Sequence, residues 1–112
     1  MNEYVFLYRN GDRPPSPEQI QQVVQKWTAW FKSLADEGYL VDRGHPLEAS
    51  GKLIAGNKLI TDGPFAEAKD VVGGFSLIKA RDVSQASQLA LGCPILERGG
   101  QVEVRPIMKL NV

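Results

Sequence analysis

The segment from Tyr4 to Tyr8 predicts a strand with apolar side chains on both faces. Successive side chains of a strand point to opposite faces, so Val5 and Leu7 share one of them. The other face carries only aromatic residues, Tyr4, Phe6 and Tyr8. A strand with one face in water would alternate apolar with polar residues. This strand therefore requires a fold in which both faces of a sheet are covered.

A long amphipathic helix is predicted after the polar, proline-containing loop that follows this strand. Ser16 is the expected N-cap, Pro17 takes the first helical position and Gln19 completes a capping box. Gly38 supplies the stop. The apolar residues between these signals recur at helical spacing and form one broad face: Ile20, Val23, Val24, Trp27, Trp30, Phe31 and Leu34.

The remaining elements are shorter. They are a strand at 39–42 that turns out at 43–46, a hairpin of 52–54 with 58–61, a strand at 75–80, a helix from Asp82 to Gly92, and a last strand at 101–105. This order predicts an α+β fold, a ferredoxin-like antiparallel sheet with two helices on one face. Two helices cover only one face of such a sheet. We therefore expect two copies to pair through the other face as a homodimer.

Composition narrows the function classes. A length of 112 residues suits one domain, spanning residues 1–112. Thirteen basic residues balance thirteen acidic ones and are scattered, so we expect no nucleic-acid partner. No apolar segment approaches the ~20 residues that cross a bilayer, and the N-terminus lacks the pattern of a signal peptide. We expect a cytoplasmic protein without a membrane partner.

The stretch at 61–75 predicts a functional site. Asp62 and Gly63 precede a proline that can begin a short helical turn at 64–69, where the Asp62 carboxylate would accept backbone N–H groups. Gly73 and Gly74 then open an apolar strand. Glycines at a strand entry indicate a bulge or a close approach to the backbone.

The run T-D-G-P-F at 61–65, together with Gly73-Gly74-Phe75, resembles the signature of the DGPF proteins within the YCII-related family. The resemblance extends over nearly the whole chain. It includes Trp27 and Phe31 on the first helix, the loop at 44–47, Cys93-Pro94 and the segment 102–106. It implies a dimeric α+β barrel of the ferredoxin-like kind, and it implies a His–Asp pair proposed as an active site in a cleft. Members that resemble this chain often accompany extracytoplasmic-function sigma factors, which implies a regulatory setting.

Asp62 and His45 are the candidate catalytic residues. His45 is the chain's one histidine, the side-chain type suited to proton exchange near neutrality. The competing interpretation of His45 is an exposed loop residue. For Asp62 it is a helix cap worth about 1 kcal/mol.

Trp27, Phe65 and Arg105 are the residues that we predict to contact a ligand. Trp27 also suits core packing, although a buried indole N–H needs a partner that a ligand could supply. Arg105 projects opposite Val102 and Val104, where it could hold a carboxylate ligand or pair with Glu103 or Asp62.

We expect no metal and no cofactor. One histidine with scattered acids lacks the spacing of a metal site, although a lone His45 could ligate haem axially. Cys93, the only cysteine, suits a small buried residue better than a nucleophile because no base is evident nearby.

Two functions remain open. One is a small-molecule binder or enzyme in which Asp62 and His45 perform acid–base chemistry of the isomerase or lyase type. The other is a non-catalytic regulatory module that binds a protein partner, for example in transcription. The chain carries no nucleophile elbow, P-loop or paired histidines that would favour an established enzyme class.

Overall fold

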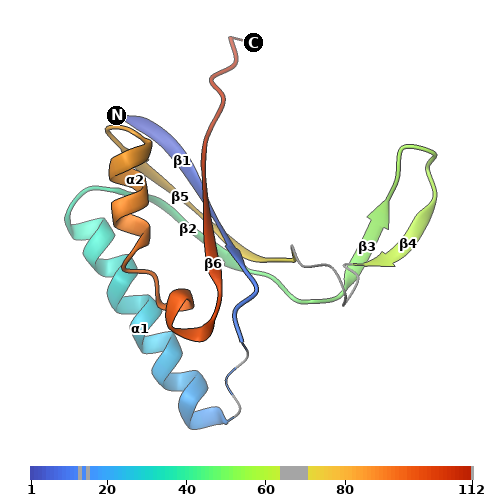
Figure 1. Ribbon diagram of the computed structural model, residues 1–112, viewed down its shortest axis with the longest axis horizontal. Helices are drawn as coiled ribbons and strands as arrows, with labels where there is room; N and C mark the ends of the chain where they lie inside the picture. Colours follow the sequence, from blue (N-terminus) through green and yellow to red (C-terminus); the bar gives the residue numbers. More distant parts are fainter. Residues whose placement is uncertain (13, 15, 64–70, 112) are drawn as a thin grey trace.

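The computed structural model describes residues 1–12, 14, 16–63 and 71–111. The elements, in chain order, are β1 (Asn2–Arg9), α1 (Pro17–Asp36), β2 (Leu40–Pro46), β3 (Gly51–Ile54), β4 (Ile60–Gly63), β5 (Val72–Ala80), α2 (Val83–Ala90), the 3-10 helix η1 (Pro94–Arg98) and β6 (Gln101–Pro106). Figure 1 shows α1 and α2 on the same side of the main sheet.

The main sheet has four strands in the order β2-β5-β1-β6, and all of its neighbouring strands pair antiparallel. β1 and β5 are the two central strands. The two helices connect strands that are not neighbours, as the ferredoxin-like pattern requires. The predicted α+β, ferredoxin-like architecture is confirmed.

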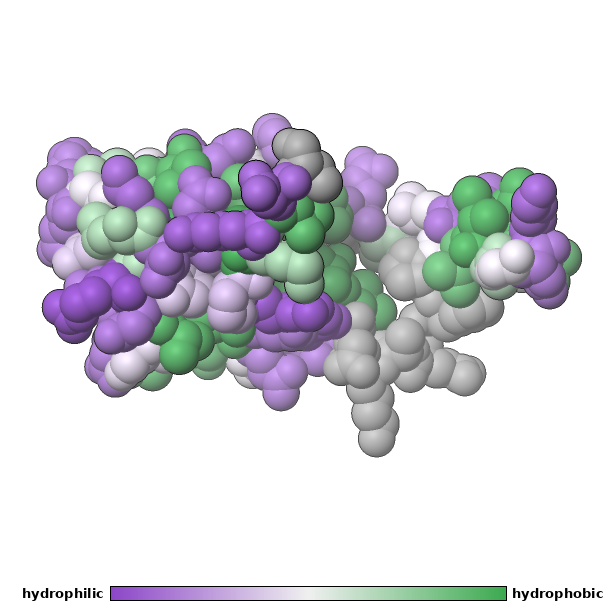
Figure 2. Space-filling view, turned by 90° about the horizontal axis from the view of Figure 1, so that it is seen from above, coloured by the Kyte–Doolittle hydropathy of each residue, from purple (hydrophilic) through white to green (hydrophobic). Residues whose placement is uncertain are grey.

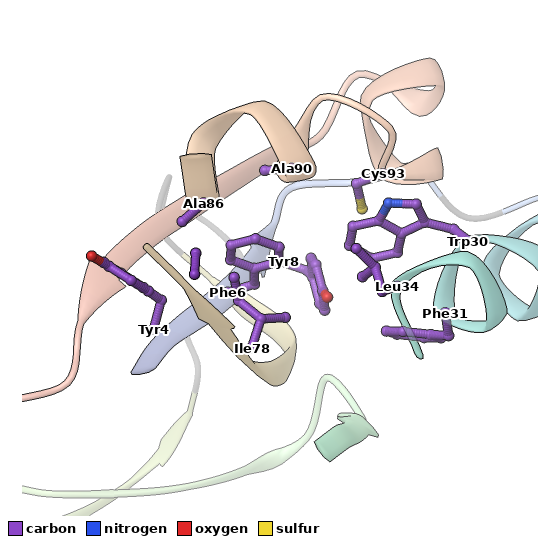
Figure 3. Packing of buried hydrophobic residues seen from close by; sticks show 11 residues of the cluster. Tyr4, Phe6, Tyr8, Trp30, Phe31, Leu34, Ile78, Ala86, Ala90 and Cys93 are labelled. Atoms are coloured by element: carbon purple, nitrogen blue, oxygen red, sulfur yellow. The ribbon is translucent and has the colours of Figure 1, made fainter. Parts of the chain in front are cut away.

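The hydrophobic core lies between this sheet and the helices. The aromatic face of β1 packs against α1, where Trp30, Phe31 and Leu34 are buried. The Phe6 and Trp30 rings are stacked with their centroids 6.1 Å apart. Figure 3 shows Phe6 below Ala86 and Ala90 of α2, with Trp30, Leu34 and Phe31 beside it on the side of α1. Small residues on α2 let this short helix lie close to the sheet.

Local signals set both helix starts. The Ser16 side chain accepts a hydrogen bond from the Gln19 backbone N–H at 3.2 Å, and Pro17 begins α1. The Asp82 carboxylate accepts from the Gln85 N–H at 2.8 Å, which caps α2 in the same way. Beyond α1, Gly38 has a positive φ of 82°, the left-handed conformation that ends a helix.

The prediction that the chain turns out of the sheet at 43–46 is wrong, because β2 continues to Pro46. Register shifts between Leu40 and Asp42 and between Asp42 and His45 absorb the extra residues. Gly44 has a φ of +68°, and a Cβ built there would lie 1.8 Å from the Phe75 carbonyl oxygen. Only glycine therefore permits this pairing with β5.

The hairpin of β3 and β4 forms a separate two-stranded sheet. It projects away from the four-stranded sheet (Figure 1). The chain leaves and re-enters the main sheet at one point, where the Leu47 N–H donates to the Gly73 carbonyl at 2.8 Å. Figure 2 shows hydrophobic side chains on the surface of the hairpin. Its large exposed apolar residues are Leu53, Ile54, Leu59 and Ile60.

The sheet face opposite the helices carries a second apolar set. Val5 lies opposite Leu77, and Leu7 lies opposite Phe75, across the β1–β5 pair. All four side chains are partly exposed, whereas their neighbours on the helix face are buried. In the described part of the chain, neither α1 nor α2 covers this face (Figure 1). Among these residues there is also no helix with the length and apolar character needed to cross a membrane.

Candidate functional site

A cleft of about 920 Å³ lies between α1 and one end of the sheet. Its described lining comes from five places: the middle of α1, the end of β1 with its following loop, the end of β2, the start of β5, and η1. Most of the lining side chains are apolar or aromatic. The volume falls in the range of roughly 300–1,000 Å³ that is common for small-molecule sites.

A chain of hydrogen bonds joins the cleft to the sheet. The Tyr8 hydroxyl donates to Ser76 Oγ at 2.8 Å, and Ser76 Oγ donates to the Arg43 carbonyl oxygen at 2.5 Å. Burial raises the pKa of Tyr8 far above its ordinary value, although the Ser76 hydrogen bond opposes this shift. Tyr8 is therefore a neutral, fixed part of the wall, and the bonds hold β1, β5 and β2 in register.

Gly74 gives this wall its close packing. It pairs with Tyr8, and a Cβ built on it would lie 3.1 Å from the His45 carbonyl oxygen and 3.4 Å from the Tyr8 ring. The β1–β5 register also shifts between Tyr8 and Arg9. The expectation of a bulge or a close approach at Gly73-Gly74 is confirmed.

An aromatic wall faces the cleft from α1. Trp27 meets the Tyr8 ring edge-on at 4.8 Å between centroids, and it lies 5.7 Å from the Phe31 ring. Its side chain is only partly buried. Among the described residues, no hydrogen-bond acceptor is recorded for the Trp27 indole N–H, so this donor is available to a ligand.

Two positively charged side chains and one histidine lie at the cleft. The Arg43 guanidinium lies over the Phe31 ring, 5.0 Å from its centroid. The His45 ring contacts Phe75 edge-on at 6.2 Å between centroids. Arg98 Nε donates to the Asp12 carbonyl oxygen at 2.9 Å, which ties η1 to the loop after β1. The cleft therefore combines aromatic surface with donors and one group that can exchange protons.

The structure brings together two of the residues predicted for the site. His45 and Trp27 both line the cleft. Asp62 lies on the projecting hairpin, its side chain is 89% exposed, and it pairs with Lys52. It is not among the described residues that line the cleft. Phe65 and the turn predicted at 64–69 lie outside the described residues.

Arg105 also lies away from the cleft lining. It sits on β6 opposite Val5, on the sheet face that the helices leave uncovered, and its guanidinium is 3.6 Å from the Glu103 carboxylate. Val102 and Val104 pack against the core on the other face. The predicted direction of Arg105 is thus observed, and its ion-pair partner is Glu103, one of the two acids expected for it.

Sequence reasoning missed Arg43 as a cleft residue. It falls in the segment 43–46 that was expected to turn away from the sheet, and the pairing of β2 with β5 instead directs it toward Phe31. An arginine two residues before the only histidine was the available signal.

Cys93 is buried beside the Trp30 ring (Figure 3). Burial raises the pKa of the Cys93 thiol to about 12, although a backbone hydrogen bond at Ile95 opposes this shift. A thiol that resists ionisation is a poor nucleophile. Among the residues that the structure describes, no three or more His, Cys, Asp and Glu side chains gather closely enough to hold a metal ion.

These features define a small α+β protein with a ferredoxin-like antiparallel sheet and an aromatic cleft at one end of that sheet. The chain belongs to the YCII-related domain family, whose model matches residues 3–111. A comparison with curated proteins gives no match.

Proposed function

We propose that this YCII-related protein binds a small molecule in the cleft between α1 and the sheet. The observation that carries the proposal is the cleft itself, about 920 Å³ and walled by Trp27, Phe31 and Tyr8. Its aromatic wall offers apolar contact, and its few polar groups, His45 among them, would orient the ligand. Any acid–base chemistry of the isomerase or lyase type would fall to His45, the histidine of the described lining.

Chemistry centred on Asp62 receives less support. Its carboxylate pairs with Lys52 on an exposed hairpin, where water screens the charge. We therefore propose His45 as the proton-transferring residue and Trp27 as a ligand contact, without Asp62 as their partner within one chain.

We also propose that the protein is a homodimer. The partly exposed apolar residues on the helix-free sheet face and on the hairpin support this assembly. The same hairpin supports the second candidate function, a regulatory module, because its exposed apolar residues could bind a protein partner. The cleft favours small-molecule binding over that alternative.

The experiment that tests ligand binding is a thermal-shift screen of metabolites on three proteins. Val24 is exposed on α1 and lines the cleft, so Val24→Trp would fill it without disturbing the core. Ala29→Trp is the matched control, the same enlargement at an exposed position of α1 outside the described lining. A ligand at 100 times its Kd stabilises a protein by about 2.7 kcal/mol.

We expect compounds that raise the Tm of the wild type and of Ala29→Trp to have no effect on Val24→Trp. Equal shifts in all three proteins would place binding elsewhere and contradict the proposal. The absence of any stabilising compound for the wild type would contradict it too. His45→Gln should abolish turnover of a bound substrate while leaving its binding within a few-fold.

A further inference from the structure

The charge around the cleft is predominantly positive. In the described lining, the guanidinium groups of Arg43 and Arg98 accompany a single carboxylate, that of Asp12. The chain as a whole has no net charge. This local excess of positive charge therefore comes from the residues that the fold gathers here, and it favours an anionic ligand.

Arg98 and Asp12 are already engaged with each other's backbone. The Asp12 N–H donates to the Arg98 carbonyl oxygen at 3.0 Å, and Arg98 Nε donates to the Asp12 carbonyl oxygen at 2.9 Å. This pair of bonds fixes the loop after β1 against η1 at the cleft. Arg98 therefore has mainly a structural role, which is to hold the loop after β1 against η1. The negative charge of Asp12 lies close to it.

Arg43 is differently placed. No carboxylate of the described residues pairs with its guanidinium, which lies over the Phe31 ring. A cation–π contact needs no hydrogen-bond acceptor, so it does not use the N–H groups of the guanidinium. The contact with Phe31 therefore leaves the donors that would bind a carboxylate available at an exposed position.

The backbone under Arg43 is also held firmly. Its carbonyl oxygen accepts the hydrogen bond from Ser76 Oγ, which is buried and in turn accepts from the Tyr8 hydroxyl. On the other side, the Gly44 N–H donates to the Asp42 carboxylate at 2.8 Å. A donor group on a fixed backbone loses less conformational freedom when it binds a ligand.

The surface beside Arg43 is aromatic. The Trp27 and Phe31 rings are tilted by 39° to each other, and the Trp27 indole N–H has no recorded acceptor in the described chain. Either ring can contact the face of a planar apolar group. The indole N–H adds a donor to the described lining.

We propose that the ligand of the cleft is a carboxylate on a flat apolar body, with the carboxylate held by the edge of Arg43 and the body against Trp27. This inference rests on the proposed function, because it names the chemical class that the same cleft takes. Arg43 then sets specificity: it selects acids over neutral molecules of the same shape.

Two probes that differ only in charge test the proposal. 2-Naphthoate is a flat aromatic acid and 2-naphthamide is its neutral counterpart. Binding is followed by NMR titration of the protein, with the Trp27 indole N–H as the reporter of the cleft and the buried Trp30 as the internal comparison. The variants are Arg43→Gln and Arg43→Lys. Arg105→Gln is the matched control, because Arg105 lies outside the described lining.

We expect 2-naphthoate to bind the wild type and Arg105→Gln about tenfold more tightly than 2-naphthamide. Arg43→Gln should lose this preference and leave the affinity for the amide unchanged. Arg43→Lys should retain only part of it, since a lysine lacks the planar fork. Should Arg43→Gln fail to fold, the acid-to-amide ratio of the wild type and of Arg43→Lys still decides the matter.

The two proposals fail in different ways. Equal affinity of the acid and the amide at the cleft, or an unchanged preference in Arg43→Gln, would overturn the carboxylate inference and leave small-molecule binding intact. If neither probe shifts the Trp27 indole and the metabolite screen finds no stabilising compound, small-molecule binding itself fails.

Discussion

Among the described residues, Tyr8 and Cys93 are the side chains whose pKa values depart clearly from their ordinary range. Both lie in the core beside Trp30, and desolvation raises both pKa values because a phenolate or a thiolate would lose its hydration there. Neither group is therefore prepared for nucleophilic attack. Their effect is on stability at high pH.

Cys93→Ala should reduce the loss of stability in alkali. The raised pKa means that the thiol contribution is complete below about pH 9 and is lost as the pH rises toward 12, since the unfolded state releases its proton first. One such proton corresponds to a slope of about 1.4 kcal/mol per pH unit. Urea unfolding of the wild type and the variant between pH 8 and 11 measures it.

The comparison needs an internal control, because Tyr8 also contributes to alkaline instability. Its raised pKa acts in the same direction and is present in both proteins. The difference between the two slopes reports the thiol together with its electrostatic effect on Tyr8, which raises the Tyr8 pKa. Identical slopes from pH 9 upward would show that Cys93 ionises as readily in the folded protein as in the unfolded one.

Single residues were predicted well where local chemistry decides and poorly where tertiary placement decides. Trp27 follows from the helical spacing of its neighbours, which puts it on the sheet-facing side of α1. Nothing local reveals that Asp62 lies on a projecting hairpin, because the direction of a hairpin depends on contacts distant in sequence. Arg43 was missed for the same reason.

At the scale of secondary-structure elements, the capping residues determine where the helices begin. Ser16→Ala should lower the free energy of unfolding by about 1 kcal/mol, because the Gln19 N–H would lose its acceptor. Ser16→Asp should retain most of that energy. Ser33→Ala is the matched control, an exposed serine inside the same helix. Chemical denaturation measures all three changes, and an equal loss in Ser16→Ala and Ser33→Ala would contradict the capping role.

The strands show why some boundaries cannot be predicted locally. Gly44, His45 and Pro46 are typical turn residues, yet hydrogen bonding to β5 keeps them in β2 with irregular register. The 3-10 helix η1 was likewise not anticipated, although Pro94 begins it and Gly99, at a φ of +74°, ends it. Tertiary pairing outweighs local propensity in both places.

For the whole molecule, the proposed homodimer makes the sheet face opposite the helices a buried interface. Leu77→Lys would put a charge into its centre, opposite Val5. We expect this variant to elute at the monomer mass by light scattering at micromolar concentration, where the wild type elutes as a dimer. Burying an unpaired ammonium costs several kcal/mol, enough to dissociate most dimers.

Val83→Lys is the control for this substitution. Val83 is 50% exposed on α2, away from the helix-free face, so its change should leave the dimer mass unaltered. A wild-type protein that runs as a monomer at the same concentration would contradict the proposed assembly.

A hydrogen bond between the Leu47 N–H and the Gly73 carbonyl joins the two ends of the segment that includes β3 and β4. Since β2 and β5 already pair at Pro46 and Gly74, their register does not depend on the β3–β4 hairpin. The β3–β4 hairpin is thus an insertion that the main sheet does not need for its own pairing. Replacing the hairpin with a tight turn would preserve β2 and β5, and lengthening it would change the surroundings of the cleft without changing the sheet.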